Sequence, residues 1–201
     1  MYEYRLARSL PREKIPRHIG VILDGNRRWA KSEGSPASEG HRVGASKVLE
    51  FLQWAQEMGV QIVTLWMLST DNMARDKAEV DQLLEIIGAT VDQLAAEGRY
   101  QIRIVGDKAL FPEEFVQRID NAVLRTKNLD TKMVVNVAVG YGGRKELVDA
   151  VRSFLREAGE QGKSITDVAR DLSDQDITEH LYTRGQPDPD LIIRTSGEQR
   201  L

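Results

Sequence analysis

The chain has 201 residues, 41% hydrophobic and 29% charged, with a formal net charge of −3. This length and composition are typical of one globular domain. The acidic balance argues against a nucleic-acid partner, because nucleic-acid-binding proteins normally carry a basic excess. There is no cysteine, which excludes disulfides and thiolate chemistry.

No apolar run approaches the ~20 residues that a membrane span requires. Residues 1–14 are mixed and charged, unlike a secretory signal. We therefore expect a soluble, cytoplasmic protein.

Apolar runs and helical stripes alternate along the chain. Most of the runs are continuous, which is typical of strands covered on both faces, and the stripes have the i, i+3, i+4, i+7 spacing of packed helices. This alternation predicts an α/β fold with a central, mainly parallel sheet flanked by helices. The loop-like residues 34–40 are expected to form a mobile flap. The predicted strands are residues 19–23, 61–68, 101–105, 133–139 and 191–193, and the helical stripes lie in residues 48–55, 83–94, 115–123 and 147–158.

In parallel sheets, ligands bind at the carboxyl ends of the strands. Four predicted strands are followed by glycine, arginine and small polar residues, which points to one shared site. These segments are residues 24–29, 69–75, 140–144 and 194–200.

The segment after the first strand has the composition of a phosphate site. Gly25 and Asn26 take positive φ at low cost, so their N–H groups can turn toward one point, and Arg27 and Arg28 add forked donors. A lone carboxylate beside a phosphate is unfavourable unless a divalent cation bridges them, so Asp24 suggests Mg²⁺. The alternative is a plain strand-to-helix turn with solvated arginines.

The last segment is a second anion candidate, with Arg194, Ser196 and Arg200 as its donors, although a surface turn is the alternative. Two anion sites with one acid between them suggest a reaction of two diphosphates. Ordinary nucleotide binding has no motif in support, because the chain has neither a Walker pattern nor G-x-G-x-x-G. A nucleophile elbow is also missing.

Five ordered motifs resemble those of the cis-prenyltransferases, the undecaprenyl diphosphate synthase family. Within that family, Arg27 and the run Gly-Gln-Pro-Asp-Pro-Asp at 185–190 look most like actinobacterial short-chain Z-isoprenyl (Z-farnesyl) diphosphate synthases. The motifs are H-I-G-V-I-L-D-G-N-R-R-W-A at 18–30, G-H-R-V-G at 40–44, L-S-T-D-N-M-A-R at 68–75, N-V-A-V-G-Y-G-G-R at 136–144 and D-L-I-I-R-T-S-G-E-Q-R-L at 190–201.

The resemblance implies a Mg²⁺-dependent prenyltransferase. It would condense isopentenyl diphosphate with an allylic diphosphate, geranyl or farnesyl, into a Z-prenyl diphosphate, and would be a homodimer. Asp24 would hold Mg²⁺ and, with Ser69 and Asn72 near the reacting carbons, form the catalytic set. The implied substrate-binding residues are Gly25, Asn26, Arg27, Arg28, Trp29, His41 and Arg75 for the allylic diphosphate, and Arg194, Ser196 and Arg200 for isopentenyl diphosphate.

Several of these residues have an alternative, structural interpretation. His41 could be a partly buried structural histidine, and Ser69 and Asn72 are residue types that favour helix starts. Trp29, like Trp66, is of a type that more often packs than contacts substrate. Tyr141, in the fourth motif, could only shape a tight strand exit.

The sequence departs from the family pattern at four points. Met73 replaces an aromatic residue, Asp76 replaces a proline, and Ala37 stands where a basic flap residue is usual. The family continues beyond the position of Leu201 with a hydroxyl contact, a strand and an acidic metal ligand. We therefore expect residues 1–201 to be a single catalytic domain that lacks the family's C-terminal end.

Met67, preceded by Trp66, stands where long-chain members carry a small residue, which predicts a short product. The tunnel walls are expected to come from the helical stripe at residues 83–94. The alternatives are a long-chain decaprenyl or undecaprenyl diphosphate synthase and a non-catalytic partner subunit. An apolar product makes peripheral membrane contact plausible, although no amphipathic anchor is evident.

Overall fold

The structure, a computed structural model, describes residues 11–197. Its centre is a five-stranded sheet in the order β3-β4-β2-β1-β5, and every neighbouring pair is parallel. The predicted mainly parallel α/β fold is confirmed, with each strand within two residues of its predicted bounds. The strands are β1 (His18–Ile22), β2 (Ile62–Ser69), β3 (Gln101–Val105), β4 (Val134–Tyr141) and β5 (Leu191–Arg194).

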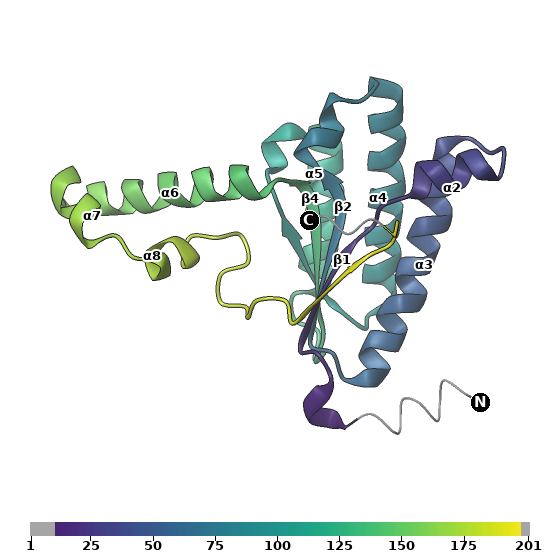
Figure 1. The fold of residues 1–201 in the computed structure, drawn as a ribbon, viewed down its shortest axis with the longest axis horizontal. Helices are drawn as coiled ribbons and strands as arrows, with labels where there is room; N and C mark the ends of the chain where they lie inside the picture. Colours follow the sequence, from purple (N-terminus) through teal and green to yellow (C-terminus); the bar gives the residue numbers. More distant parts are fainter. Residues whose placement is uncertain (1–10, 198–201) are drawn as a thin grey trace.

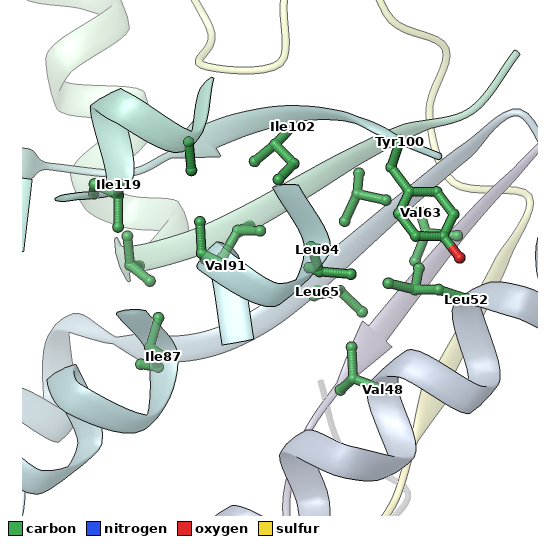
Figure 2. Packing of buried hydrophobic residues seen from close by; sticks show 14 of the residues in the cluster. Val48, Leu52, Val63, Leu65, Ile87, Val91, Leu94, Tyr100, Ile102 and Ile119 are labelled. Carbon is green, nitrogen blue, oxygen red and sulfur yellow. The ribbon is translucent and has the colours of Figure 1, made fainter. Parts of the chain in front are cut away.

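Three helices cover one face of the sheet (Figure 1): α3 (Ala37–Met58), α4 (Lys77–Glu97) and α5 (Glu113–Thr126). Their predicted apolar stripes meet the sheet in one core (Figure 2), where Leu52, Leu65 and Val91 are fully buried. Burial of such a side chain stabilises the fold by about 1.5–3 kcal/mol. Short helices connect these elements: η1 (Arg12–Lys14), α2 (Asn26–Ser32), η2 (Thr70–Ala74) and η3 (Lys108–Leu110).

A buried polar network lies between strands β1, β2 and β4 and the chain that precedes β5. His18 contacts the carbonyl of Pro187 through Nδ1 at 2.7 Å and Thr64 Oγ1 through Nε2 at 2.8 Å. Asn136 donates to the same Thr64 oxygen at 2.9 Å and also bonds Gln186. Because these groups are buried, leaving one unpaired would be costly. The network therefore holds the approach to β5 against the sheet, and β5 then pairs with β1.

The helix α6 (Gly143–Glu160) extends away from the sheet, followed by α7 (Ile165–Asp171) and α8 (Asp174–Thr178) (Figure 1). The stripe at residues 147–158 forms a helix, as predicted, but only part of it is buried, with Ala150 and Ala158 1% and 3% exposed. Leu147, Val151 and Leu155 are 52%, 36% and 39% exposed, because α6 leaves the sheet end-on instead of lying across it. Within residues 11–197, no helix is both long enough and apolar enough to cross a membrane.

Residues 34–40 are not one flap. Helix α3 already begins at Ala37, so only the first part of this segment is loop. Gly40 lies against α2, where an added Cβ would stand 2.2 Å from the carbonyl oxygen of Asn26. Glycine at this position therefore allows α3 to approach α2 closely, which brings the following His41 to the cleft.

Candidate active site

A cleft of about 960 Å³ opens at the carboxyl ends of the strands, within the usual size range of ligand sites. Five cationic side chains and two carboxylates line it, although the whole chain is acidic. The prediction that the strand ends share one site is thus confirmed. The charged residues are Arg27, Arg28, Lys31, Arg75 and Arg194, with Asp24 and Asp71.

Asp24 lies between the two predicted anion sites. Its Oδ2 accepts hydrogen bonds from Arg194 Nη2 at 2.7 Å and Nε at 3.2 Å, and from Ser196 Oγ at 3.1 Å. Arg28 Nη2 stands 3.9 Å away. The hydrogen bonds from Arg194 hold the pKa of Asp24 below its usual range, against the opposing effect of burial. The two sites are therefore one continuous site, with an ionised carboxylate at its centre.

The turn after β1 depends on Gly25, whose φ of +91° is the left-handed conformation that glycine adopts at low cost. The N–H of Gly25 donates to Asp24 Oδ1 at 2.6 Å. Asn26 does not share this conformation, contrary to expectation. It is the first residue of α2, and no residue other than glycine between 11 and 197 has a positive φ.

Thr195 was missed by the sequence analysis. Its Oγ1 donates to the carbonyl of Asp24 at 2.6 Å and accepts from the Asp24 N–H at 3.0 Å. These bonds join the end of β5 to the end of β1. They also explain why Arg194, 170 residues away in the chain, reaches the carboxylate of Asp24.

His41 and Arg75 both line the cleft, and they are close enough for the charge of Arg75 to act on the His41 ring. Nε2 of His41 is buried and has no hydrogen-bond partner in the described chain. Burial and the positive charge of Arg75 lower the pKa of His41, while Glu79 has the opposite effect. Glu79 accepts a hydrogen bond from Arg75 Nη1 at 3.0 Å. The sequence analysis did not identify Glu79, and the only signal for it was its i, i+4 spacing from Arg75.

Ser69 and Asn72 both line the cleft and also form a reciprocal cap on η2. The Ser69 hydroxyl accepts from the Asn72 N–H at 3.3 Å, and the Asn72 side chain accepts from the Ser69 N–H at 3.2 Å. The capping interpretation is therefore confirmed, together with their placement in the cleft. Asp76, where the family has proline, caps α4 through the N–H of Ala78 at 2.9 Å. Met73 packs against the core.

The other half of the cleft is apolar. Register shifts at Trp66–Leu68 and Leu68–Ser69 interrupt the pairing of β2 with β4, so that Trp66 and Met67 both line the cleft. Such a bulge re-aims side chains at a strand end. Trp66 also packs edge-on against Tyr141, with ring centroids 5.9 Å apart. Of the expected wall residues, Leu83, Ile86 and Ile87 line the cleft, whereas Val91 and Leu94 are buried in the core instead.

Three predicted substrate-binding residues are not cleft-lining side chains. Trp29 is 42% exposed and is not among the residues that line the cleft, so neither core packing nor substrate contact is supported for it. Ser196 contacts Asp24 but does not line the cleft itself. Arg200 lies outside the described residues.

The donor set at Asp24 fits Mg²⁺ only with help from substrate. Between residues 11 and 197, no group of three or more His, Cys, Asp or Glu side chains is placed to hold a metal. Mg²⁺ is commonly held by one or two carboxylates together with substrate phosphates. A single ionised carboxylate beside several arginines is compatible with that mode of binding.

Comparisons with known proteins agree with the motifs. A family model described as "Putative undecaprenyl diphosphate synthase" matches residues 22–201. The chain is 54% identical over 202 residues to a (2Z,6E)-farnesyl diphosphate synthase of Thermobifida fusca, and 50% identical over 200 residues to isoprenyl transferase 1 of Streptomyces avermitilis. These matches cover all of this chain and 79% and 77% of the relatives.

The fold is also that of a solved structure, lavandulyl diphosphate synthase from Lavandula x intermedia in complex with dimethylallyl diphosphate. The TM-score is 0.86 at 34% identity, over 94% of this chain and 80% of that one. The chain belongs to the undecaprenyl diphosphate synthase family of cis-prenyltransferases, as its motifs indicated.

Proposed function

We propose that this chain condenses isopentenyl diphosphate with a short allylic diphosphate, geranyl or farnesyl, into a short Z-prenyl diphosphate. The observation that carries this proposal is the division of one cleft into a cationic end around Asp24 and an apolar end around Met67. A diphosphate with a hydrocarbon tail needs both. Relatives named (2Z,6E)-farnesyl diphosphate synthase and short-chain Z-isoprenyl diphosphate synthase, at 54% and 46% identity, support the short product.

In this reaction, the bond between C1 and oxygen of the allylic substrate breaks, and diphosphate leaves with the electron pair. C4 of isopentenyl diphosphate bonds to C1, and one proton is lost from C2. The departing diphosphate gathers negative charge, so preorganised cations at its position accelerate the step. Arg27, Arg28, Arg75 and His41 all line the cleft and would bind the allylic diphosphate.

Arg194, which also lines the cleft, would bind isopentenyl diphosphate. It now donates to the Asp24 carboxylate, so substrate phosphate would share or replace that partner. Asp24 would hold Mg²⁺, which neutralises diphosphate charge when bound. Because the pKa of Asp24 is lowered, its carboxylate is available as a ligand at neutral pH.

Ser69 and Asn72 would orient isopentenyl diphosphate and the group that receives its proton. Neither side chain ionises near neutral pH, so we assign them an orienting part and not that of the final base. Their reciprocal cap fixes both side chains at the end of β2, beside the apolar wall.

Met67 would limit the product. Its side chain stands at the bulge of β2, in the same cleft as Leu83 and Ile87 of α4, and occupies space that a smaller residue would leave to a growing chain. Methionine is adaptable, so it would set a soft limit on length.

The test is turnover of purified protein with isopentenyl diphosphate and either geranyl or farnesyl diphosphate, with Mg²⁺ or with chelator, followed by mass spectrometry. We expect product only with Mg²⁺, extended by one or few isoprene units. A long polyprenyl product would contradict the assignment of length and favour the long-chain alternative. No turnover under any condition would favour the non-catalytic partner subunit.

We further propose a homodimer that buries the apolar side of α6, since Leu147, Val151 and Leu155 lie exposed on it. Light scattering after chromatography should give a dimer for the wild type and a monomer for Val151→Asp. Asp171→Asn is the control, because it alters an exposed carboxylate on α7, the helix that follows α6. A monomeric wild type would contradict the dimer. Peripheral membrane contact stays a prediction.

A further inference from the structure

Glu79 contacts the cationic residues of the cleft but does not line the cleft itself. Its carboxylate is 22% exposed, and it does not line the cleft, unlike Arg27, His41 and Arg75. One of its oxygens, Oε1, lies 3.0 Å from Arg75 Nη1 and 3.7 Å from Arg27 Nε. A single oxygen therefore connects two arginines that come from different segments of the chain.

The carboxylate is itself held on a rigid element. Glu79 lies in the first turn of α4, whose start is capped by Asp76. Negative charge is favourable in the first turn of a helix. Because α4 packs into the core along its length, the backbone of Glu79 is held in place. Its carboxylate can therefore restrict the longer side chains of Arg75 and Arg27.

Arg75 and Arg27 depend on this contact to different degrees. The side chain of Arg75 is 25% exposed and that of Arg27 is 57% exposed. Without Glu79, the two guanidinium groups would repel each other, and both carry considerable rotamer freedom. A site whose donors are already in place loses less free energy on binding.

We propose that Glu79 is a positioning residue that holds Arg75 and Arg27 toward the diphosphate of the allylic substrate. This inference rests on the proposed function and adds a residue that touches no substrate. The direction in which substrate affinity changes when Glu79 is neutralised distinguishes this role from a purely electrostatic one. A carboxylate that acted only through its charge would repel a diphosphate, so neutralising it would tighten binding; neutralising a positioning carboxylate weakens binding.

The experiment compares Glu79→Gln with wild type by calorimetry, using geranyl thiolodiphosphate, an unreactive allylic analogue, with Mg²⁺. We expect Kd for the analogue to rise by about fivefold to tenfold, because ordering a long side chain has that order of cost. In turnover, KM for geranyl diphosphate should rise by a similar factor, while KM for isopentenyl diphosphate and the Tm stay close to wild type. Glu79→Asp, which keeps the charge on a shorter stem, should give an intermediate Kd.

Glu85→Gln is the matched control. Glu85 lies on the same helix, pairs with Arg118 at 2.9 Å and is 72% exposed, so its loss should leave both constants unchanged. Equal or tighter binding of the analogue by Glu79→Gln would overturn the inference, as would an equal rise in both KM values. A wild type that fails to bind the analogue would overturn the proposed function and the inference with it.

Discussion

The two ends of the cleft are built in different ways. The cationic end collects side chains from separate segments and holds them by polar contacts, and two of its arginines stay open to solvent, with Arg27 and Arg28 57% and 59% exposed. The apolar end is part of the core, where Leu83 and Ile87 are 5% and 2% exposed. Under the proposed function, the cationic end would bind and activate the diphosphates, and the apolar end would limit how far the product grows.

This difference follows from what each end must do. Charge development at a leaving diphosphate is stabilised by donors in fixed directions, so a single substitution there has a large effect. A hydrocarbon chain is bound by shape and area, so a change at the apolar end shifts a preference by a modest amount. Four substitutions test whether the two ends behave separately.

Asp24→Asn should have the largest effect, a loss of about 10²–10³-fold in kcat, because it removes the carboxylate that would hold Mg²⁺ against the leaving diphosphate. Steady-state turnover at saturating Mg²⁺ measures it, and the product that does form should keep its length. Asp171→Asn, on the exposed surface of α7, is the control. Full activity in Asp24→Asn would show that the reaction does not need the Asp24 carboxylate.

Met67→Ala should lengthen the product while turnover continues. Removal of the side chain opens the apolar end beside Leu83 and Ile87, so chains longer by one or more isoprene units should accumulate. Mass spectrometry of the products is the measurement. Met58→Ala is the control, because Met58 ends α3 and packs against the core without lining the cleft. Unchanged product length would show that Met67 sets no limit.

Arg194→Ala should raise the pKa of Asp24. Hydrogen bonding from Arg194 is the largest cause of the lowered value, and burial, which raises it, would remain. In the wild type the carboxylate stays ionised until pH falls below the usual range of aspartate, about 3.9. In the variant it should protonate at higher pH, as NMR titration of the carboxyl carbon would detect. Arg28→Ala, at 3.9 Å, should shift it less. An unchanged pKa of Asp24 would contradict the conclusion that Arg194 and Asp24 form one continuous site.

Tyr141→Phe should have the smallest effect on activity. The hydroxyl donates to buried Glu146 at 2.7 Å, and burial, together with this bond, raises its pKa, so it remains neutral. We expect kcat close to wild type and a free energy of unfolding lower by about 1–3 kcal/mol, since an acceptor loses its partner. Chemical denaturation measures the second quantity. A large loss of kcat with unchanged stability would place the hydroxyl in the chemistry.

Apolar runs were sufficient to predict the strands and the edge of the sheet where the site lies. The same reasoning placed Asp24, Arg75 and Arg194 together, because carboxyl ends of parallel strands converge. It could not predict the bulge at Met67, which depends on how β2 pairs with β4. It predicted α6 as a helix but not its placement away from the sheet, since a helical stripe shows that a face is apolar and not what covers it.

Contacts between side chains were the other limit. The two hydrogen bonds from Arg194 to Oδ2 of Asp24 join residues 170 positions apart, whereas the motifs assigned Asp24 to Mg²⁺ and Arg194 to isopentenyl diphosphate. Trp29 is part of the first motif, yet its side chain is 42% exposed and does not line the cleft. Glu79 lies outside the motif that contains Arg75, and only its spacing hinted at the pair.

The most direct test of the central claim is the geometry of the new double bond. Wild-type protein would be incubated with isopentenyl diphosphate, geranyl diphosphate and Mg²⁺, and the product dephosphorylated. Gas chromatography would compare it with authentic (2Z,6E)- and (2E,6E)-farnesol. The account predicts the 2Z alcohol. A 2E alcohol would contradict it, and so would a product that contains neither farnesol isomer.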